Sequence, residues 1–329
     1  MTVSEDRGRR TGARTRPVHF GINLMPHSWV GREPIEGVAL MAHRAALLAR
    51  MHHAGMDHVM VGDHVMFHGG VGNDGLTDAA AVANATDDLG VYLSVYLMVL
   101  RHPVLVARQI LTVAQFIPGR FSVGLGIGGD DRREVTACGV DPRTRGRRMD
   151  DALSVVRRLL VGEKVSHDGE FFQLDEVQVL PVPSEPVPLV VGGRSEAALR
   201  RSGRLGDGWL GIWTSAQRCA RAIDVVEAHA VAAGRSDVDW RHGMTFWCGF
   251  GRNREQARSA VGPPMEALYR TPFDRFERYV PYGTPSQVAD YIAPYIEAGA
   301  TTINFIPFAG SDEAAIDAVG QTRQLLGGR

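Results

Sequence analysis

The sequence predicts an α/β fold, a (β/α)8 TIM barrel that carries insertions. Short apolar runs alternate with longer amphipathic segments, a pattern typical of strands that are each followed by a helix. Most runs are apolar at nearly every position, as expected for parallel strands covered on both faces. Eight alternations favour a closed barrel over a doubly wound sheet, which remains the alternative. The expected strands are His19–Leu24, His58–Gly62, Val91–Leu100, Phe121–Gly126, Leu189–Val191, Trp209–Ile212, Met244–Phe250 and Thr302–Phe308.

Amphipathic segments with recognisable ends separate these strands. A helix is expected over about Ile35–Met51, and Gly55 ends it. Its expected apolar face consists of Val38, Met41, Ala45 and Leu48. A second helix follows Arg145, with an apolar face of Met149, Leu153, Val156 and Leu160. Near the end of the chain, Thr284-Pro285 predicts a helix start and Gly299 a helix stop.

The chain is expected to form one domain, residues 18–329, behind a disordered tail, residues 1–17. The tail is polar, rich in arginine and free of aromatic residues. It contains the twin arginine Arg9-Arg10, but no apolar segment follows, so an export signal is not expected.

Two insertions are expected in the barrel, near 164–187 and 252–281. In the first, Lys164–Leu174 alternates around Asp168-Gly169, which predicts a β-hairpin with a two-residue turn before the fifth strand. The second follows the seventh strand and is rich in Arg, Pro and aromatic residues. A barrel carries lid-like loops at this position.

The composition argues against nucleic-acid and membrane partners, so a small molecule is the expected class of partner. The 329 residues carry a formal net charge of −1 without a broad basic face, so no nucleic-acid partner is expected. No apolar run approaches the roughly 18 residues of a membrane span. Cys138, Cys219 and Cys248 form no CxxC pair, which suits a reducing cytoplasm.

The second expected strand ends in Asp63-His64, and His68 follows. In a TIM barrel, functional groups lie at the C-terminal ends of strands. His64 would place an acid/base imidazole there, and Asp63 would orient it or bind a cofactor hydroxyl. The alternative is a histidine that only caps a loop. His64 and His68 lack a third ligand at helical spacing, so no metal site is expected. Arg101, at the end of the third strand, is expected to form an ion pair at the rim.

Glycines end two further strands. The segment Phe121–Gly129 would let backbone N–H groups approach a planar ring or a phosphate, with close packing as the alternative. Pro188–Ser195 runs through two glycines into a helix that opens at Ser195, which favours a phosphate site over a simple turn. Arg194 would add charge-assisted hydrogen bonds. The candidate cofactor-binding residues of the two segments are Gly128, Gly129, Gly192, Gly193, Arg194 and Ser195.

Taken together, these motifs resemble the bacterial luciferase-like family of flavin- and deazaflavin-dependent oxidoreductases, from His19 to Leu326. The family fold is a TIM barrel whose third strand carries a bulge with a non-prolyl cis peptide against the redox ring. The resemblance places that bond at Ser94–Val95 and makes both residues cofactor-binding candidates. The motifs are VGDH (61–64), RHP (101–103), IPGRF (117–121), VGLGIGG (123–129), GVDPRTRGRRMDDAL (139–153), VGGRS (191–195), GDGWL (206–210) and YGTPSQVADYI (282–292).

The resemblance also implies residue roles. Asp63 and His64 match the pair that deazaflavin-dependent members place beside the redox ring, and the family's sugar-phosphate dehydrogenases use this histidine as acid/base. Gly192 and Gly193 match the family's phosphate-binding backbone. The implied function is hydride transfer between coenzyme F420 and a small organic substrate. The alternative is an FMN-dependent two-component monooxygenase.

Three positions depart from the family pattern. The dehydrogenases carry a tryptophan where this chain has His68, and their acidic residue after the glycine run falls on Gly129 here. The luciferase arginine falls on Ile127. The candidate catalytic residues are therefore His64, His68 and one substitute acid among Asp130, Asp131 and Glu134, with Glu134 as the candidate. The chain is thus expected to be neither a sugar-phosphate dehydrogenase nor a luciferase in the narrow sense.

Further expectations follow from the family. Its members are commonly dimers, so a homodimer is expected, with a separate flavin or F420 reductase as a second partner. A non-catalytic barrel that only binds a flavin, and a metal-dependent hydrolase on the same fold, remain as alternatives.

Overall fold

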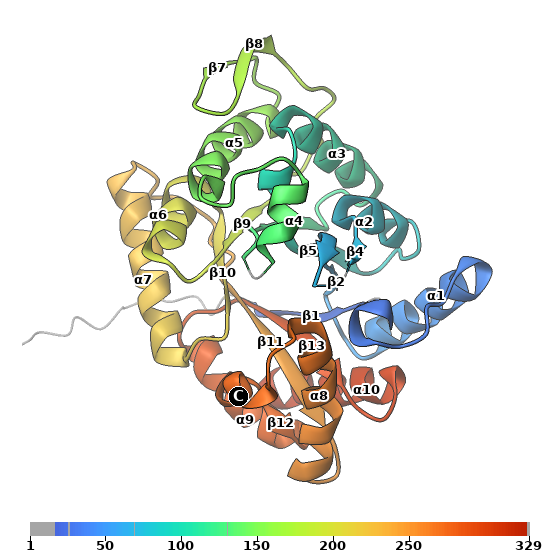
Figure 1. Ribbon diagram of the computed structural model, residues 1–329. Coiled ribbons are helices and arrows are strands. Elements are labelled where there is room, and N and C mark those ends of the chain that lie inside the picture. The colour runs from blue at the N-terminus through green and yellow to red at the C-terminus, as the bar shows by residue number, and fades with distance from the viewer. Residues whose placement is uncertain (1–16, 26, 69, 130, 328–329) are drawn as a thin grey trace, which may run out of the picture.

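A computed structural model of the chain describes residues 17–25, 27–68, 70–129 and 131–327. The tail expected at 1–17 lies, apart from Pro17, outside these ranges. Nine strands form one sheet, and eight of them close into a parallel barrel with helices on its outside, as predicted (Figure 1). In order around the barrel, the eight strands are β1 (His19–Asn23), β2 (His58–Val61), β5 (Gly90–Tyr96), β6 (Phe121–Leu125), β9 (Leu189–Gly192), β10 (Gly208–Ile212), β11 (Gly243–Phe250) and β13 (Thr302–Phe308).

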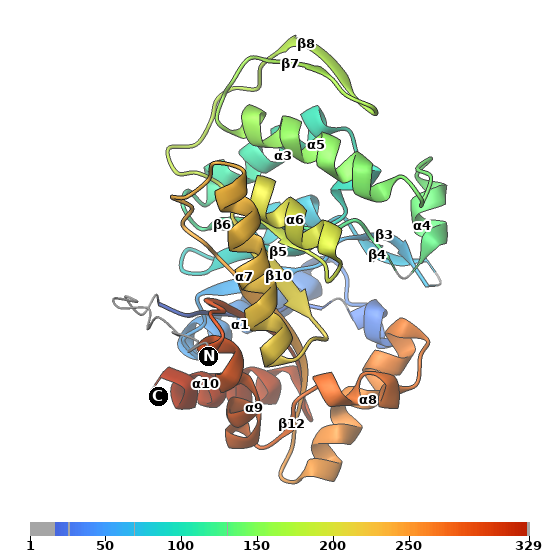
Figure 2. The same cartoon turned by 90° about the vertical axis from the view of Figure 1, so that its left-hand side faces the viewer.

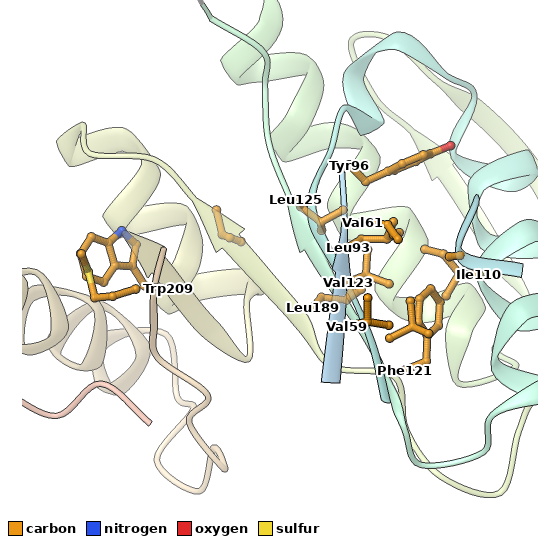
Figure 3. Packing of buried hydrophobic residues seen from close by; sticks show 14 of the residues in the cluster. Val59, Val61, Leu93, Tyr96, Ile110, Phe121, Val123, Leu125, Leu189 and Trp209 are labelled. Atoms are coloured by element: carbon orange, nitrogen blue, oxygen red, sulfur yellow. The ribbon is translucent and has the colours of Figure 1, made fainter. Parts of the chain in front are cut away.

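The strands read as continuous apolar runs because both of their faces are buried. On β2, Val59 and Val61 pack with Leu93 under the surrounding helices, as Figure 3 shows. Met60, between them, belongs to a separate cluster with Tyr92, Val190 and Leu210 inside the barrel. Alternate residues of one strand therefore fill two different apolar layers.

The third barrel strand is shorter than predicted. It was expected to reach Leu100, but β5 ends at Tyr96 and Met98–Leu100 forms a 3-10 helix, η2. The register of β5 against β6 shifts between Leu93 and Tyr96. The backbone N–H of Leu97 then donates to the buried carboxylate of Asp63 at 2.8 Å rather than continuing the sheet. A tertiary hydrogen bond thus ends the strand inside an apolar run.

A helix follows each barrel strand. No helix in the described part of the chain is long and apolar enough to cross a membrane. The predicted start at Thr284 is confirmed, since its side chain and that of Gln287 form a capping box. The covering helices are α1 (Gly37–His53), α2 (Gly75–Ala83), α3 (Pro103–Phe116), α5 (Arg145–Leu160), α6 (Glu196–Leu205), α7 (Ala216–Ala232), α9 (Pro285–Glu297) and α10 (Asp312–Gly327).

The predicted apolar faces hold for α5 but not for α1. Met149, Leu153, Val156 and Leu160 of α5 are all buried. On α1, by contrast, Val38 and Met41 are 82% and 72% exposed. The buried residues of α1 are Leu47, Leu48 and Met51, because only its C-terminal half packs on the barrel.

The first insertion is a hairpin between α5 and β9, but its turn differs from the prediction. Strands β7 (Val165–Asp168) and β8 (Gln173–Val177) pair Asp168 with Gln173, so the turn holds four residues, 169–172, rather than two. The reason is Asp151 on α5, whose carboxylate accepts the backbone N–H groups of Phe171 and Phe172 at 2.7 and 3.2 Å. The hairpin stands at the edge of the molecule in Figure 1.

The second insertion is mostly helical rather than a loop. It contains α8 (Arg254–Tyr269) and two 3-10 turns, η3 (Phe273–Arg275) and η4 (Glu277–Tyr279), and returns to β12 (Tyr282–Gly283), which pairs with β11. Asn253 caps α8, and an apolar face of Ala257, Val261, Met265 and Leu268 is buried. Two further elements rise beside the barrel, the small sheet of β3 (His64–Phe67) and β4 (Val71–Asn73) and the short helix α4 (Arg132–Ala137). Figure 2 shows α4 close to β3 and β4 on the same side as α8.

Candidate active site

A cavity of about 320 Å³ opens at the C-terminal ends of the barrel strands. Its lining has two parts. The glycine wall follows three neighbouring strands, β5, β6 and β9, and consists of Ser94, Val95, Gly126, Gly128, Gly129, Gly192 and Gly193. The aromatic wall comes from β11, from the segments after β1 and β10, and from α8. It consists of Trp29, Trp213, Thr245, Trp247 and Tyr269. His64 leaves β2 and lines the cavity where the two walls meet.

The imidazole of His64 pairs with the carboxylate of Glu134. Its Nδ1 atom lies 3.1 and 3.2 Å from the two carboxylate oxygens. The ring is held from the sides by Trp29, with ring centroids 5.3 Å apart, and by Phe67, with centroids 4.2 Å apart. His64 therefore has one ring nitrogen fixed by the protein while the residue itself lines the cavity.

Glu134 is held as a charged carboxylate. Only 2% of it is exposed, and this burial raises its pKa. Hydrogen bonds from His64 and from the backbone N–H groups of Val65 and Met66 outweigh the burial, so the pKa lies below its ordinary value. An ionised carboxylate can only accept hydrogen bonds, so Nδ1 of His64 carries the hydrogen. Nε2 is then the ring nitrogen that this contact leaves available for a proton.

Of the two roles expected for Asp63, orienting His64 or binding a cofactor hydroxyl, the structure does not show the first. Its two oxygens accept from the guanidinium of Arg101 at 2.7 and 2.8 Å. They also accept the backbone N–H groups of Gly75 and Leu97 at 2.9 and 2.8 Å. Asp63 thus ties the end of β2 to the start of α2 and to the segment after β5. This fully engaged carboxylate also has less capacity for the expected bond to a cofactor hydroxyl.

Arg101 forms the expected ion pair at the rim. Besides Asp63 it binds Asp74, the N-cap of α2, at 2.9 Å, and its guanidinium lies 4.4 Å from the ring centroid of Tyr96. This network holds the segment after the β5 bulge against the end of β2 and the start of α2. The sequence identified Arg101 as an ion-pair residue but not its partners.

His68, a predicted catalytic residue, does not line the cavity. Its ring packs against Phe67 at 4.2 Å between centroids, and its backbone N–H donates to Asp131 at 3.0 Å. Its Nδ1 lies 3.6 Å from the same carboxylate, which also caps α4. His68 therefore closes the β3–β4 turn onto α4, a position that does not support a catalytic role. Within the ranges that the structure describes, no group of three or more His, Cys, Asp or Glu side chains could hold a metal ion.

The substitute acid comes from α4. Of the three candidates, Glu134 contacts the imidazole of His64 and Asp131 contacts His68. Asp130 lies outside the described residues. Glu134, the acid expected from the sequence, is thus the one of the described candidates that reaches the imidazole.

The glycine wall is a surface of backbone. The peptide bond between Ser94 and Val95 is cis, as expected. A Cβ atom at Gly126 would lie 2.5 Å from Cγ2 of Val95, so only glycine fits against the bulge. Such a surface lets a planar ring approach the main chain closely.

The end of β9 leads into α6 as expected. Gly193 adopts φ +131°, and Ser195 caps α6 by accepting the N–H of Ala198. The first N–H groups of a helix lack partners within the helix, and here they follow a glycine in the wall, which favours an anion. Arg194 lines the cavity, and its guanidinium lies 5.8 Å from the ring centroid of Trp213. Ser195 does not line the cavity, so its role is to cap the helix rather than to contact a ligand directly.

The aromatic wall was not predicted from the sequence. Trp213 follows β10 with φ +50° and packs on Tyr269, the last residue of α8, at 5.1 Å between ring centroids. Trp247 of β11 packs on Tyr269 at 5.5 Å. The only available signal was a large aromatic residue at a strand end, and core packing accounts for that pattern equally well.

Comparisons with known proteins agree with this architecture. A family model described as luciferase-like monooxygenase matches residues 18–302. An uncharacterized protein of Mycobacterium tuberculosis (strain H37Rv) is 37% identical over 132 residues, 40% of this chain and 45% of that protein. The similarity to this relative thus spans less than half of its length.

Other matches extend further along the chain. An F420-dependent glucose-6-phosphate dehydrogenase of Nakamurella multipartita is 25% identical over 274 residues, 74% of this chain and 80% of that enzyme. Among solved structures, an F420-dependent secondary alcohol dehydrogenase in complex with an F420–acetone adduct superposes with a TM-score of 0.80 at 20% identity. That match covers 94% of this chain and 99% of the other, and it establishes the similarity of fold.

Proposed function

Because the chain belongs to the luciferase-like monooxygenase family and is therefore an oxidoreductase, we propose that it uses coenzyme F420 to transfer a hydride to or from a small organic substrate. The observation that carries this proposal is the pair of His64 and Glu134, which stands where the two walls of the cavity meet. Relatives named as F420-dependent dehydrogenases, similar along most of the chain, support the choice of cofactor.

The glycine wall fits a deazaflavin. A planar ring would lie against the backbone of Ser94 and Val95 and of Gly126–Gly129, where a side chain at Gly126 would clash with Val95. The phosphate of the cofactor would meet Gly192 and Gly193, the first N–H groups of α6 and the guanidinium of Arg194. When bound, F420 supplies a ring carbon that accepts or donates a hydride.

His64 moves the proton that accompanies the hydride. In the direction of substrate oxidation, Nε2 takes the proton of a substrate hydroxyl, and in the reverse direction it returns that proton. Glu134 holds the ring with Nδ1 as donor and stabilises the imidazolium that forms. Glu134 is thus a positioning residue, because it acts through His64.

The test combines cofactor binding with turnover. We expect F420 to bind the purified protein, and turnover to be lost in His64→Ala while F420 still binds. Unchanged turnover in His64→Ala would contradict the proposed role of His64. Absence of turnover in the wild type, with binding retained, would instead favour a barrel that only binds the cofactor.

The FMN-dependent monooxygenase is the less supported candidate, because the relatives similar along most of the chain are named as F420-dependent. Parallel titrations with F420 and FMN, followed by absorbance, separate the two. Tight binding of FMN without binding of F420 would overturn the proposal.

The proposal has further parts that concern the whole protein. Residues 18–329 act as one catalytic domain, in a homodimer, in the cytoplasm, and a separate flavin or F420 reductase supplies reduced cofactor. The three cysteines are free, which suits a reducing compartment. Light scattering of the purified protein checks the dimer.

A further inference from the structure

The pair of His64 and Glu134 depends on one excursion of the chain. After β6 the chain leaves the glycine wall at Gly128 and reaches α5 after Pro142, and α4 lies between these two points. We call residues 128–142 the α4 excursion. Helix α4 has six residues, and a helix of this length is not stable in water by itself. The place of Glu134 therefore depends on the contacts that hold the α4 excursion.

One guanidinium joins the two ends of the α4 excursion. Nη1 of Arg145 donates to the carbonyl oxygen of Gly128 at 2.8 Å, and its Nε donates to the carbonyl oxygen of Pro142 at 2.7 Å. Gly128 belongs to the glycine wall and has φ +67°. Hydrogen bonds from a charged donor are stronger than those between neutral groups. Arg145 therefore closes the α4 excursion at its base.

The far side of the α4 excursion contacts the strand that carries His64. Glu134 contacts the imidazole and also accepts two backbone N–H groups of β3. Arg145 is half-buried and is not among the residues that line the cavity. It can therefore affect the imidazole only through the backbone that it binds and the helix that this backbone carries.

The stability of α5 does not account for an arginine at this position. The first turn of α5 carries Arg145, Arg147 and Arg148 and no acidic residue. The N-terminal end of a helix has a partial positive charge, which disfavours a cation there. Arg147 pairs with Glu170 at the surface, and Arg148 donates to the carbonyl oxygen of Val99 at 2.8 Å. The contacts of these arginines thus lie outside their own helix, and those of Arg145 lie at the α4 excursion.

We propose that Arg145 is a positioning residue, which holds the α4 excursion so that Glu134 reaches His64. This inference rests on the proposed function and goes beyond it, because it assigns a role in the reaction to a side chain outside the cavity. Arg145 acts on the proton transfer through Glu134 and on the cofactor site through the backbone of Gly128. Without its two hydrogen bonds the base of the excursion opens, and Glu134 holds the imidazole less tightly.

The first experiment removes the donors of Arg145. Arg145→Met keeps a long side chain without any N–H group, and we expect turnover at saturating F420 to fall by about tenfold. F420 should bind about threefold more weakly, because the carbonyl of Gly128 loses its donor. Arg145→Lys keeps a charged donor and should recover part of the turnover. Arg147→Met is the matched control, since it removes the same charge from the same helix turn, and it should leave turnover unchanged.

A double-variant cycle tests whether Arg145 acts through Glu134. Arg145→Met should lower turnover in the wild type but add little to the loss in Glu134→Ala, because the contact that Arg145 positions is already gone there. A purely structural role would lower thermal stability without this coupling. Equal losses of turnover in the two backgrounds overturn the proposal, and so does wild-type turnover in Arg145→Met.

A measurement without cofactor separates this inference from the proposed function. The nitrogen chemical shifts of the His64 ring, assigned with the help of His64→Ala, should move in Arg145→Met in the direction seen in Glu134→Ala. They should stay unchanged in Arg147→Met. Failure of the wild type to bind F420 overturns the proposed function, whereas wild-type shifts in Arg145→Met overturn the inference alone. If Arg145→Met does not fold, Arg145→Gln replaces it in every measurement, with the same outcomes.

Discussion

The two walls of the cavity are built by different means. The glycine wall is main chain, shaped by the bulge of β5 and by glycines at the ends of β6 and β9. The aromatic wall is side chain, and part of it, Tyr269, belongs to the helical insertion after β11. Backbone at strand ends cannot change without disturbing the sheet, whereas a side chain there can be exchanged with the barrel intact. The comparison leads to a hypothesis, in which backbone fixed by the fold would recognise the proposed cofactor and replaceable side chains would select the substrate.

His64 stands at the junction of the walls, and its loss is expected to have the largest effect. His64→Ala should lower turnover by about 10²- to 10⁴-fold, because the proton acceptor is gone. F420 affinity, a property of the glycine wall, should change little. Steady-state kinetics and a cofactor titration check both parts. His68→Ala is the control, and an equal loss there would show that the pair has been misassigned.

The second prediction concerns the partner of His64. Glu134→Gln keeps the shape of the side chain but removes its charge, so we expect turnover to fall by about 10- to 100-fold. The pH profile of turnover should shift as well, because the imidazolium loses its neighbouring anion. A loss of turnover with an unshifted profile would reduce Glu134 to a structural role.

Glu134 also makes stability depend on pH. Its pKa in the folded protein lies below the ordinary value of 4.5, so the charged form favours folding above that value. This contribution is lost as the pH falls through the lower folded pKa. Urea unfolding of the wild type and of Glu134→Gln should therefore differ at neutral pH and converge in acid. Glu163→Gln, which breaks an exposed pair with Arg158, is the control and should change little.

A fourth prediction tests the glycine wall directly. In Gly126→Ala the new methyl group would meet Val95, and we expect a destabilisation of about 1–3 kcal/mol together with roughly tenfold weaker binding of F420. Gly310→Ala is the matched control, since a Cβ there meets nothing within 4 Å. Thermal unfolding and calorimetry measure the two effects. Equal behaviour of the two variants would contradict the close approach of ring to backbone.

The smallest effect is expected at the far end of the same wall. Arg194→Ala should weaken F420 binding by only about three- to tenfold, because this guanidinium is exposed and the first N–H groups of α6 remain. Repeating the titration at high salt should narrow the difference further. A selective loss of substrate affinity instead would place Arg194 with the aromatic wall.

The sequence was sufficient to predict the strands of the barrel but not the details of the segments that connect them. All eight strands could be predicted, because strands buried on both faces produce apolar runs at regular intervals. The C-terminal end of β5 and the length of the hairpin turn could not be predicted. Asp63 and Asp151 determine them by contacts between distant segments of the chain. The exposed half of α1 was missed because periodicity alone does not say what a helix packs against.

The same limit applies to the candidate site. Position at a strand end was enough to single out His64, and the cis bond at Ser94–Val95 followed from the family resemblance. Glu134 was expected as the substitute acid, but its direct pairing with His64 depended on the path of the loop before α4, so orientation of His64 was also expected of Asp63. The tryptophans of the aromatic wall carry no pattern that separates a binding surface from a core.

The buried carboxylate of Asp63 has a consequence for hydrogen exchange. The amide protons of Gly75 and Leu97 are donated to this one side chain, although their residues belong to different segments of the chain. Release of the carboxylate would free both protons in one opening event. If this event dominates exchange, the opening free energies of the two amides, after correction for their intrinsic exchange rates, should match and report when the rim around the β5 bulge opens.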